Sequence, residues 1–363
     1  MAIESAQIST LVWLEPEQAD LIREVTEKAG LRVVACGMPA ASLRGRAAPE
    51  PVIAGAETFS DIRHALAETS ARLVLFASGA EADPGKEGGS PLDDMGLLRG
   101  CRERDMLLVS MEPWPQTTQQ AVAWVRDGPG AGDARLAEMV RVVPLLRDTP
   151  VFTAASEVLA GMDVGGGSAR TVAVSARGSA PEGSLGARLF DAMVVVHALL
   201  GSPESIDAAI VQQARGGAGA LEGVARGIPE SLRELRGDLT ANLRFAHGRA
   251  ASLTLSSRAG HWFRGVTVLS DAGCLRIDEQ DFEHTDPRGP ASGASRGGGG
   301  GSVHATGADA LAASLRRLVD SRGAISAPLH SPAVLAMCEA AVLSARTGQT
   351  ASPATVLRMA GAG

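Results

Sequence analysis

Short runs of apolar residues alternate with longer amphipathic segments along the first part of the chain. The apolar runs lie at 8–14, 31–36, 72–77, 106–110 and 139–146. Between them, apolar residues recur with helical spacing, which predicts helices at 16–29, 60–69, 92–104 and 117–126. Buried strands that alternate with helices are typical of a parallel sheet covered on both faces. The pattern predicts a Rossmann-like, doubly wound α/β domain over residues 1–148.

The pattern changes in the second part of the chain. Helices are expected at 151–160 and 185–200, on either side of a strand at 169–176. Strand-like segments with alternating apolar residues then follow one another at 205–214, 238–246, 249–258, 264–271 and 273–278. Such alternation predicts a largely antiparallel, open sheet with one solvated or partner-covered face. With a low-complexity loop at 289–302 and helices at 308–321 and 332–347, residues 149–363 are predicted to form an α+β domain.

Composition narrows the range of partners. The chain has 363 residues and a formal net charge of −7, which argues against a general nucleic-acid-binding protein. No run approaches the roughly 18 consecutive apolar residues of a membrane span, and the N-terminus lacks the basic start of a secretory signal. The four cysteines are scattered, without metal-ligand spacing. We therefore expect a cytoplasmic protein with reduced thiols, no membrane contact and no metal site.

Several segments, in their order along the chain, resemble the Gfo/Idh/MocA family of sugar and inositol dehydrogenases. Residues 106–117 (MLLVSMEPWPQT) are similar to a strand that ends in the family's E-K-P motif. Residues 183–208 look like the helix that begins its second domain, 241–278 like its sheet, and 331–353 like its final helix. The resemblance covers nearly the whole chain. It implies the family's two-domain fold and, in an ordinary member, a nicotinamide-dependent oxidoreductase activity.

Both dinucleotide-binding signals of that family are missing. Family members carry G-x-G-x-x-G between the first strand and helix, because the backbone must approach the pyrophosphate closely there. This chain has LEPEQA at 14–19, so Glu15 and Glu17 bring negative charge to this point, although acids in a first helical turn also simply stabilise the helix dipole. The second strand ends in CGM (36–38), without the acid that holds the ribose hydroxyls in the family. We therefore expect no cofactor.

The family's E-K-P motif is also altered. It reads Glu112-Pro113-Trp114-Pro115, so the lysine that helps to position and polarise the reacting hydroxyl is replaced by proline or tryptophan. Neither side chain can donate a charged hydrogen bond. Glu112 and Trp114 are retained as cleft candidates. Trp114 is interpreted first as a structural residue under a turn, with the wall of a sugar pocket as the alternative.

In the family's D-x-G-x-H motif, Asp191 takes the position of the histidine. Asp191 could act as a base near neutral pH only if burial raised its pKa strongly. Arg188 precedes it by three residues on the same helix face, so a plain ion pair between the two is favoured. His197 and the segment HWF (261–263) are interpreted as structural. Arg188 and Asp191 complete the set of cleft candidates.

These observations lead to two functional hypotheses. The first is a pseudoenzyme that does not bind NAD(P) in the usual way and instead binds a small sugar-like ligand or pairs with a paralogous subunit. The alternative is an active NAD(P)-dependent oxidoreductase that acts on a sugar or inositol-like substrate through a rearranged site. In either case we expect a homodimer or larger oligomer formed through the C-terminal sheet.

Overall fold

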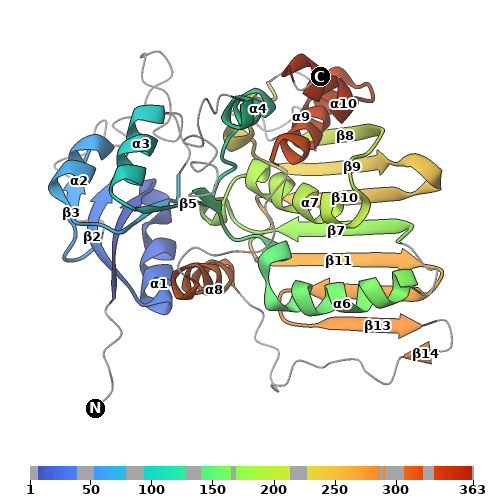
Figure 1. The fold of residues 1–363 in the computed structure, drawn as a ribbon, viewed down its shortest axis with the longest axis horizontal. Helices are drawn as coiled ribbons and strands as arrows, with labels where there is room; N and C mark the ends of the chain where they lie inside the picture. Colours follow the sequence, from blue (N-terminus) through green and yellow to red (C-terminus); the bar gives the residue numbers. More distant parts are fainter. Residues whose placement is uncertain are drawn as a thin grey trace, which may run out of the picture.

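Two β-sheets organise the chain, and each packs against helices (Figure 1). They are seen in a computed structural model that describes residues 7–38, 53–78, 94–126, 140–164, 169–212, 227–286, 289–290, 306–321 and 331–361. None of the helices in these ranges is long and apolar enough to cross a membrane.

The first sheet is parallel and has the strand order β3-β2-β1-β4-β5-β6. Its strands are β1 (Ile8–Trp13), β2 (Leu31–Gly37), β3 (Glu57–Phe59), β4 (Leu73–Phe76), β5 (Leu107–Ser110) and β6 (Val140–Val142). Along the chain they alternate with helices α1 (Ala19–Ala29), α2 (Ile62–Glu68), α3 (Met95–Glu103) and α4 (Thr118–Arg126). Because the order reverses between β1 and β4, the sheet is doubly wound, and the predicted Rossmann-like fold is confirmed.

Local signals explain where the helices of this sheet begin and end. The Asp61 carboxylate accepts hydrogen bonds from the first backbone N–H groups of α2, and Asp94 does the same for α3. Gly30 ends α1 in the left-handed conformation (φ 68°), which glycine adopts without steric cost. Both faces of the sheet are buried: Leu11 and Phe76 belong to one apolar cluster, while neighbouring strand residues belong to a second one.

Helix α8 (Gly307–Asp320) comes from the C-terminal part of the chain but packs against α1 on the first sheet (Figure 1). Its buried residue Leu311 shares an apolar cluster with Val25 of α1. An ion pair between Lys28 and Asp309 (Nζ–Oδ1 2.7 Å) lies between the same two helices. The core of the first sheet is therefore completed by a segment from the far end of the chain.

The second sheet has the order β14-β13-β12-β11-β7-β10-β9-β8. Its strands are β7 (Thr171–Arg177), β8 (Ser205–Val211), β9 (Asp238–Arg244), β10 (Ala250–Ser256), β11 (Phe263–Ser270), β12 (Gly273–Asp278), β13 (Phe282–Asp286) and β14 (Gly289–Pro290). Among these strands, β7 and β10 pair in parallel and all other neighbours pair antiparallel. The predicted, largely antiparallel sheet is confirmed.

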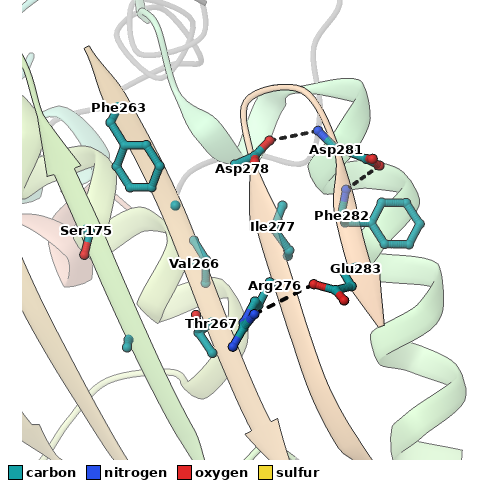
Figure 2. Close-up of a pocket in the computed structure, with 12 residues that line it drawn as sticks. Ser175, Phe263, Val266, Thr267, Arg276, Ile277, Asp278, Asp281, Phe282 and Glu283 are labelled. Carbon is teal, nitrogen blue, oxygen red and sulfur yellow. Dashed lines mark hydrogen bonds and ion pairs between the residues drawn. The ribbon is translucent and has the colours of Figure 1, made fainter. Parts of the chain in front are cut away.

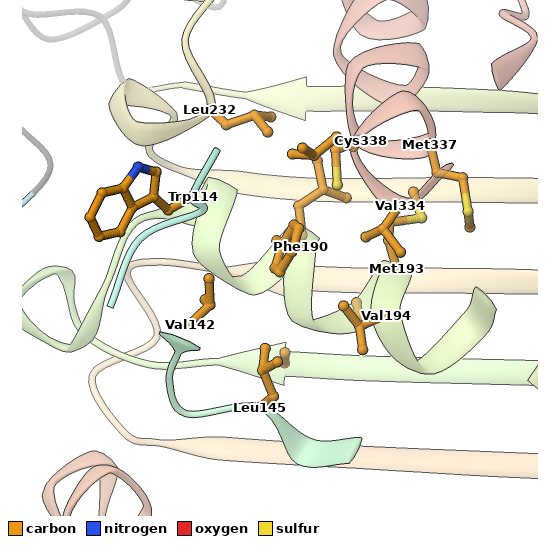
Figure 3. Packing of buried hydrophobic residues seen from close by; sticks show 14 of the residues in the cluster. Trp114, Val142, Leu145, Phe190, Met193, Val194, Leu232, Val334, Met337 and Cys338 are labelled. Carbon is orange, nitrogen blue, oxygen red and sulfur yellow. The ribbon is translucent and has the colours of Figure 1, made fainter. Parts of the chain in front are cut away.

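Helices cover one face of this second sheet. These are α6 (Pro150–Val164), α7 (Leu185–Leu200) and α9 (Ser331–Thr347), and the short α10 (Pro353–Met359) follows α9 (Figure 1). Phe190 and Met193 of α7 pack near Val334 and Met337 of α9 in the main apolar cluster (Figure 3). Burial of these apolar side chains stabilises this half of the molecule.

The opposite face of the second sheet carries mainly small and polar side chains, such as Ser252, Thr254 and Thr267. Two larger apolar residues lie exposed on it, Val211 (56%) and Leu269 (45%). A groove of about 680 Å³ lies on this face, and its lining includes Phe263, Thr267, Arg276 and Glu283 (Figure 2). The alternation seen in the sequence thus places the apolar residues under the helices and leaves an open face built from smaller residues.

The structure also contains elements that the sequence pattern did not predict. These are β3, β13, β14 and α10, all of seven residues or fewer. Segments this short have too few residues to establish a period. The strand predicted at 139–146 covers only Val140–Val142, because Pro144 has no N–H to continue the ladder. Gly289 and Pro290 pair with β13 instead of belonging to the predicted loop, and residues 291–302 lie outside the described residues.

Candidate functional site

The carboxyl ends of β1 and β4 form the edge at which the strand order of the first sheet reverses. Open α/β sheets bind their ligands in the crevice outside this edge. Three segments meet there: the turn η1 (Pro16–Gln18) before α1, the end of β5, and the second-domain turn η5 (Ala180–Glu182). This edge is the candidate functional site.

The turn between β1 and α1 is held by hydrogen bonds of its own side chains. Gln18 Oε1 accepts from the backbone N–H of Glu15 (3.0 Å), and Ser78 Oγ donates to Glu15 Oε1 (3.2 Å). Gln18 Nε2 donates to the carbonyl oxygens of Ala77 (3.0 Å) and Pro181 (3.3 Å). The Gln18 carboxamide, only 6% exposed, therefore joins the β1–α1 turn to the end of β4 and to η5 of the second domain.

The end of β2 is occupied by an indole ring. A Cβ atom placed on Gly37 would lie 2.2 Å from Cε3 of Trp13, so this position accepts only glycine while the ring stays where it is. Trp13 is 3% exposed and belongs to the core cluster that contains Phe59 and Phe76. The strand end that carries an acid in the Gfo/Idh/MocA family thus has no side chain here, and the neighbouring strand packs a tryptophan against it.

Glu112 lies at the end of β5 and is 4% exposed. Its carboxylate accepts from the backbone N–H of Ser184 (2.9 Å) and from Ser184 Oγ, and Ser184 is also the N-cap of α7. Burial raises the pKa of Glu112, while the two Ser184 hydrogen bonds and the nearby Arg236 and Arg233 oppose this. Glu112 thus links the two domains through a buried hydrogen-bonded contact.

Trp114 does not lie on a cleft surface. It is 3% exposed and packs edge-on against Phe76 (centroids 5.4 Å apart) and Trp124 (6.3 Å). This position agrees with the interpretation of Trp114 as a structural residue and leaves the sugar-pocket alternative without an exposed ring face.

Asp191 is paired, but with Arg264 of β11 and not with Arg188, so the predicted ion pair is wrong. Asp191 Oδ2 accepts from Arg264 Nη1 (2.8 Å), and Oδ1 accepts from the backbone N–H of Leu146 (2.8 Å). Arg264 also pairs with Glu279 (Nη2–Oε2 3.1 Å). Burial alone would lower the pKa of Arg264, but the two carboxylates outweigh it and raise that pKa. Burial raises the pKa of Asp191, while the nearby Arg264 opposes this effect. Because both Asp191 carboxylate oxygens already accept hydrogen bonds, Asp191 is poorly placed to act as a base.

Arg188 is buried (4% exposed) and donates to backbone carbonyl oxygens instead. Its guanidinium contacts the carbonyls of Ser179 (2.9 Å), Gly183 and Ser184 (3.1 Å). Burial lowers the pKa of Arg188 to about 10, with Glu182 and Glu112 opposing the effect. Within the described residues, Nε of Arg188 has no hydrogen-bond partner.

Three further residues singled out in the sequence are His197, His261 and Trp262. His197 is half-buried in the last turn of α7, and His261 is exposed. Trp262 donates from Nε1 to Glu279 Oε1 (2.9 Å), which anchors the loop before β11. Among the described residues, no group of three or more histidine, cysteine or acidic side chains could hold a metal ion.

Comparison with known proteins matches no family model and no curated relative. Solved structures do match over nearly the full length. An oxidoreductase from Agrobacterium radiobacter in complex with NAD+, L-tartaric acid and magnesium is 15% identical, with 97% of this chain and 100% of that chain covered and a TM-score of 0.61. A levoglucosan dehydrogenase in complex with NADH and L-sorbose is 12% identical (95% and 98% covered, TM-score 0.59). A myo-inositol dehydrogenase from Corynebacterium glutamicum is 13% identical (95% and 98% covered, TM-score 0.55).

The chain has the two-domain fold of the Gfo/Idh/MocA-type dehydrogenases. A nicotinamide dinucleotide bound to this fold in the usual way needs a glycine turn after β1 and an acid at the end of β2. The residues present do not fit such a ligand: Glu15 and Gln18 occupy the turn, and Trp13 packs over Gly37.

The structure also brings a cation to the altered E-K-P motif of this Gfo/Idh/MocA-type fold. Nε of Arg233, in the turn η6 (Leu232–Glu234) of the second domain, donates to the carbonyl oxygen of Pro113 (3.2 Å). Arg233 could not be identified from the sequence, because this contact joins residues 120 positions apart. Gln18, Ser184, Arg264 and Glu279 were missed for the same reason, since no local motif marks them.

Proposed function

We infer that this chain is a ligand-binding or partner protein built on a dehydrogenase fold, and not a conventional NAD(P)-dependent dehydrogenase. The observation that carries this proposal is the position of Gln18. Its carboxamide lies at the switch point between β1 and β4 and bonds to Ala77 and Pro181, so the chain's own side chain lies where a dinucleotide would have to enter.

The free-energy cost of displacing Gln18 supports this proposal. A dinucleotide could reach the backbone there only after Gln18 lost its hydrogen bonds to Ala77 and Pro181, at a cost of about 1–3 kcal/mol for each buried group left unpaired. The carboxylate of Glu15, held by Ser78, would then face the negative pyrophosphate. Both effects act against binding, and no glycine offers compensating backbone contacts in this turn.

The chemistry of the second domain supports the same proposal. Asp191, at the position of the family's histidine, is engaged by Arg264 and by the backbone of Leu146. Arg233 lies near the motif that has lost its lysine, but it reaches Pro113 from another element and is 4% exposed. The ligand of such a crevice would be a small sugar-like molecule, bound without hydride transfer.

The test is a calorimetric and thermal-shift titration of the full chain with NAD+, NADH, NADP+ and NADPH. We expect no stoichiometric binding, whereas a ligand present at about 100 times its dissociation constant would stabilise by about 2.7 kcal/mol. Gln18→Gly serves as the matched variant, because dinucleotide binding gained by it would identify Gln18 as the obstacle. Stoichiometric binding of any of the four to the wild-type chain at micromolar affinity would overturn the proposal.

The alternative is an active NAD(P)-dependent oxidoreductase on a sugar or inositol-like substrate. It is favoured by two of the structural neighbours, which are named as an oxidoreductase solved with NAD+ and a levoglucosan dehydrogenase solved with NADH. It predicts reduction of NAD(P)+ in the presence of polyols, which the absorbance of the reduced nicotinamide would report. The first proposal predicts no change in this absorbance with any of the polyols.

A second copy of this chain, or a paralogous subunit, is the partner we propose for the open face of the second sheet. Val211 and Leu269 are exposed on this face, and covering them would remove apolar surface from water. Small neighbours such as Ser252 and Thr254 let another sheet approach closely.

A further inference from the structure

A hollow lies at the end of the second sheet that is remote from the first domain. It has a volume of about 440 Å³, and the described residues that line it are Arg170, His247, Gly248 and Arg249. Arg170 directly precedes β7, and the other residues belong to the turn between β9 and β10. Because β7 ends at Arg177, close to the η5 turn that contacts the first domain, its beginning lies about 20 Å from that contact (Figure 1).

The strand register brings two arginines side by side in this hollow. β7 and β10 are parallel neighbours with Thr171 opposite Ala250, and Arg170 and Arg249 each come one residue earlier. The backbones are in contact here, since the N–H of Ala250 donates to the carbonyl oxygen of Arg170 (2.9 Å). Like charges on neighbouring strands repel each other, so this arrangement is unfavourable without a counter-charge.

The two arginines share one acidic partner among the described residues. Arg170 pairs through Nη2 with Asp271 of the turn between β11 and β12, but both side chains are exposed (64% and 61%), so water screens the pair. Nε and Nη1 of Arg170, and both terminal nitrogens of Arg249, donate to no acceptor in the described part of the chain. None of the described residues that line the hollow is acidic. The hollow therefore presents unused donors and an excess of positive charge.

The protein orients two of the side chains around the hollow. The Arg249 guanidinium lies over the ring of Phe245 (6.0 Å to the centroid), and its Nε donates to the carbonyl oxygen of Ala246 (3.3 Å). These contacts leave the two terminal nitrogens of Arg249 as donors. The backbone of His247 is left-handed (φ 61°), as is that of Gly248 (φ 73°), and this tight turn places His247 on the same hollow.

We propose that this hollow is a binding site for a phosphate group, free or at the end of a small phosphomonoester, with Arg170, His247 and Arg249 as its ligands. Planar guanidinium donors match the oxygens of a phosphate, and an imidazole adds a further donor. A phosphate dianion compensates both arginines, whereas a single carboxylate compensates one. The site is separate from the crevice at the switch point of the first sheet, and neither depends on the other.

Calorimetric titration of the full chain in a buffer free of phosphate tests this site. Inorganic phosphate and glycerol 3-phosphate are the phosphate probes, and acetate supplies a single carboxylate. We expect a phosphate probe to bind with a dissociation constant of about 1 mM or below, at least about tenfold more tightly than acetate, and more weakly as sodium chloride is added. Tighter binding of inorganic phosphate would identify the free ion as the ligand, and tighter binding of glycerol 3-phosphate would identify an ester; either result supports the site.

Variants at exposed positions assign the binding to this hollow. Arg170→Gln and His247→Asn should each weaken phosphate binding, the first by about tenfold; asparagine is chosen because it tolerates left-handed backbone. Asp271→Asn removes the carboxylate that competes for Arg170, so it should tighten binding by about threefold, a gain that misfolding cannot produce. Arg258→Gln is the matched control at the opposite end of β10, in an exposed pair with Asp238 (3.0 Å), and should change nothing.

Arg249 is half-buried, so its test keeps the charge. Arg249→Lys should weaken phosphate binding because a lysine lacks the planar pair of donors. Acetate bound as tightly as phosphate, or no probe bound at about 10 mM, would overturn the proposal. Equal losses in Arg170→Gln and Arg258→Gln, or no gain in Asp271→Asn, would show that any phosphate binds elsewhere on the chain.

Discussion

Arg264 of β11 and Asp191 of α7 form an ion pair (Nη1–Oδ2 2.8 Å) between a strand and the helix that covers it. Their side chains are 3% and 8% exposed, and Glu279 pairs with the other edge of the same guanidinium. Arg264 Nη1 also donates to the carbonyl oxygen of Pro144, just beyond the last strand of the first sheet (2.8 Å). One buried cation therefore joins both sheets of the molecule.

We expect Arg264→Met to lower the free energy of unfolding by about 3–5 kcal/mol, because it leaves Asp191 and Glu279 buried without a counter-charge. Guanidinium-induced unfolding would measure the loss. The matched control is Arg276→Met, which breaks an exposed ion pair with Glu283 (3.8 Å) and should cost about 1 kcal/mol or less. Equal losses in the two variants would contradict the importance of the buried pair.

Gln18→Ala should loosen the contact between the two domains. It removes the hydrogen bonds to Ala77 and Pro181 and should cost about 1–3 kcal/mol of stability, together with faster amide hydrogen exchange in 179–184. Hydrogen exchange with mass spectrometry would localise the change. Gln349→Ala, an exposed position after α9, is the control and should leave exchange in that segment unaltered. Unchanged exchange in Gln18→Ala would mean that Gln18 does not tie the domains together.

The stability of the wild-type chain relative to Glu112→Gln should depend on pH. Burial raises the pKa of Glu112 above its ordinary 4.5, so the folded chain holds this proton more tightly than the unfolded chain does. The contribution of protonated Glu112 to stability is therefore complete below pH 4.5 and is lost as the pH rises through the pKa of Glu112 in the folded chain. Glutamine is neutral at every pH, so the free energy of unfolding of Glu112→Gln should rise relative to that of the wild type from pH 4.5 toward neutrality.

Unfolding titrations of both proteins over a pH series would measure this difference. Glu283→Gln, which removes an exposed acid on β13, provides the comparison at a surface position. A stability difference between wild type and Glu112→Gln that stays constant with pH would contradict the prediction.

The open face of the second sheet can be tested as an oligomer interface. Leu269→Asp and Val211→Asp place a charge on this face, where both residues are exposed in a single chain (45% and 56%). If two copies meet there, both variants should shift the protein toward monomer in size-exclusion chromatography with light scattering, because burying a charge is unfavourable. Leu343→Asp, 42% exposed on α9, is the control and should leave the oligomeric state as it is. An unchanged mass in all three variants would place any interface elsewhere.

Much of the fold could be predicted from hydrophobic periodicity. The helix predicted at 185–200 is α7 with the same bounds, and most longer strands agree within about two residues. Periodicity works for these elements because each buries one continuous face over many residues. It failed for β3 and α10, which are too short to show a period, and it could not indicate that α8 packs on the first sheet.

The site was predicted only in part. Glu112, Arg188 and Asp191 are all buried at or near the junction of the domains, whereas Trp114 belongs to the core. Spacing on one helix favoured an ion pair between Arg188 and Asp191. Instead, Arg264 of β11 donates a hydrogen bond to the Asp191 carboxylate and forms the ion pair with it. Local spacing limits which pairs are possible, and the element packed on the same face decides which pair forms.

The sequence by itself determined the two-domain layout, the helices and long strands, and the loss of the glycine turn after β1, because these depend on residue types and short-range periodicity. Only the tertiary structure decided that Gln18 bridges Ala77 and Pro181, that Arg233 reaches Pro113, and that Arg264 holds Asp191. Each of these contacts joins residues at least 59 positions apart. Hydrogen bonds and ion pairs act over a few ångströms, so they depend on how sheets and helices are brought together, which no local pattern records.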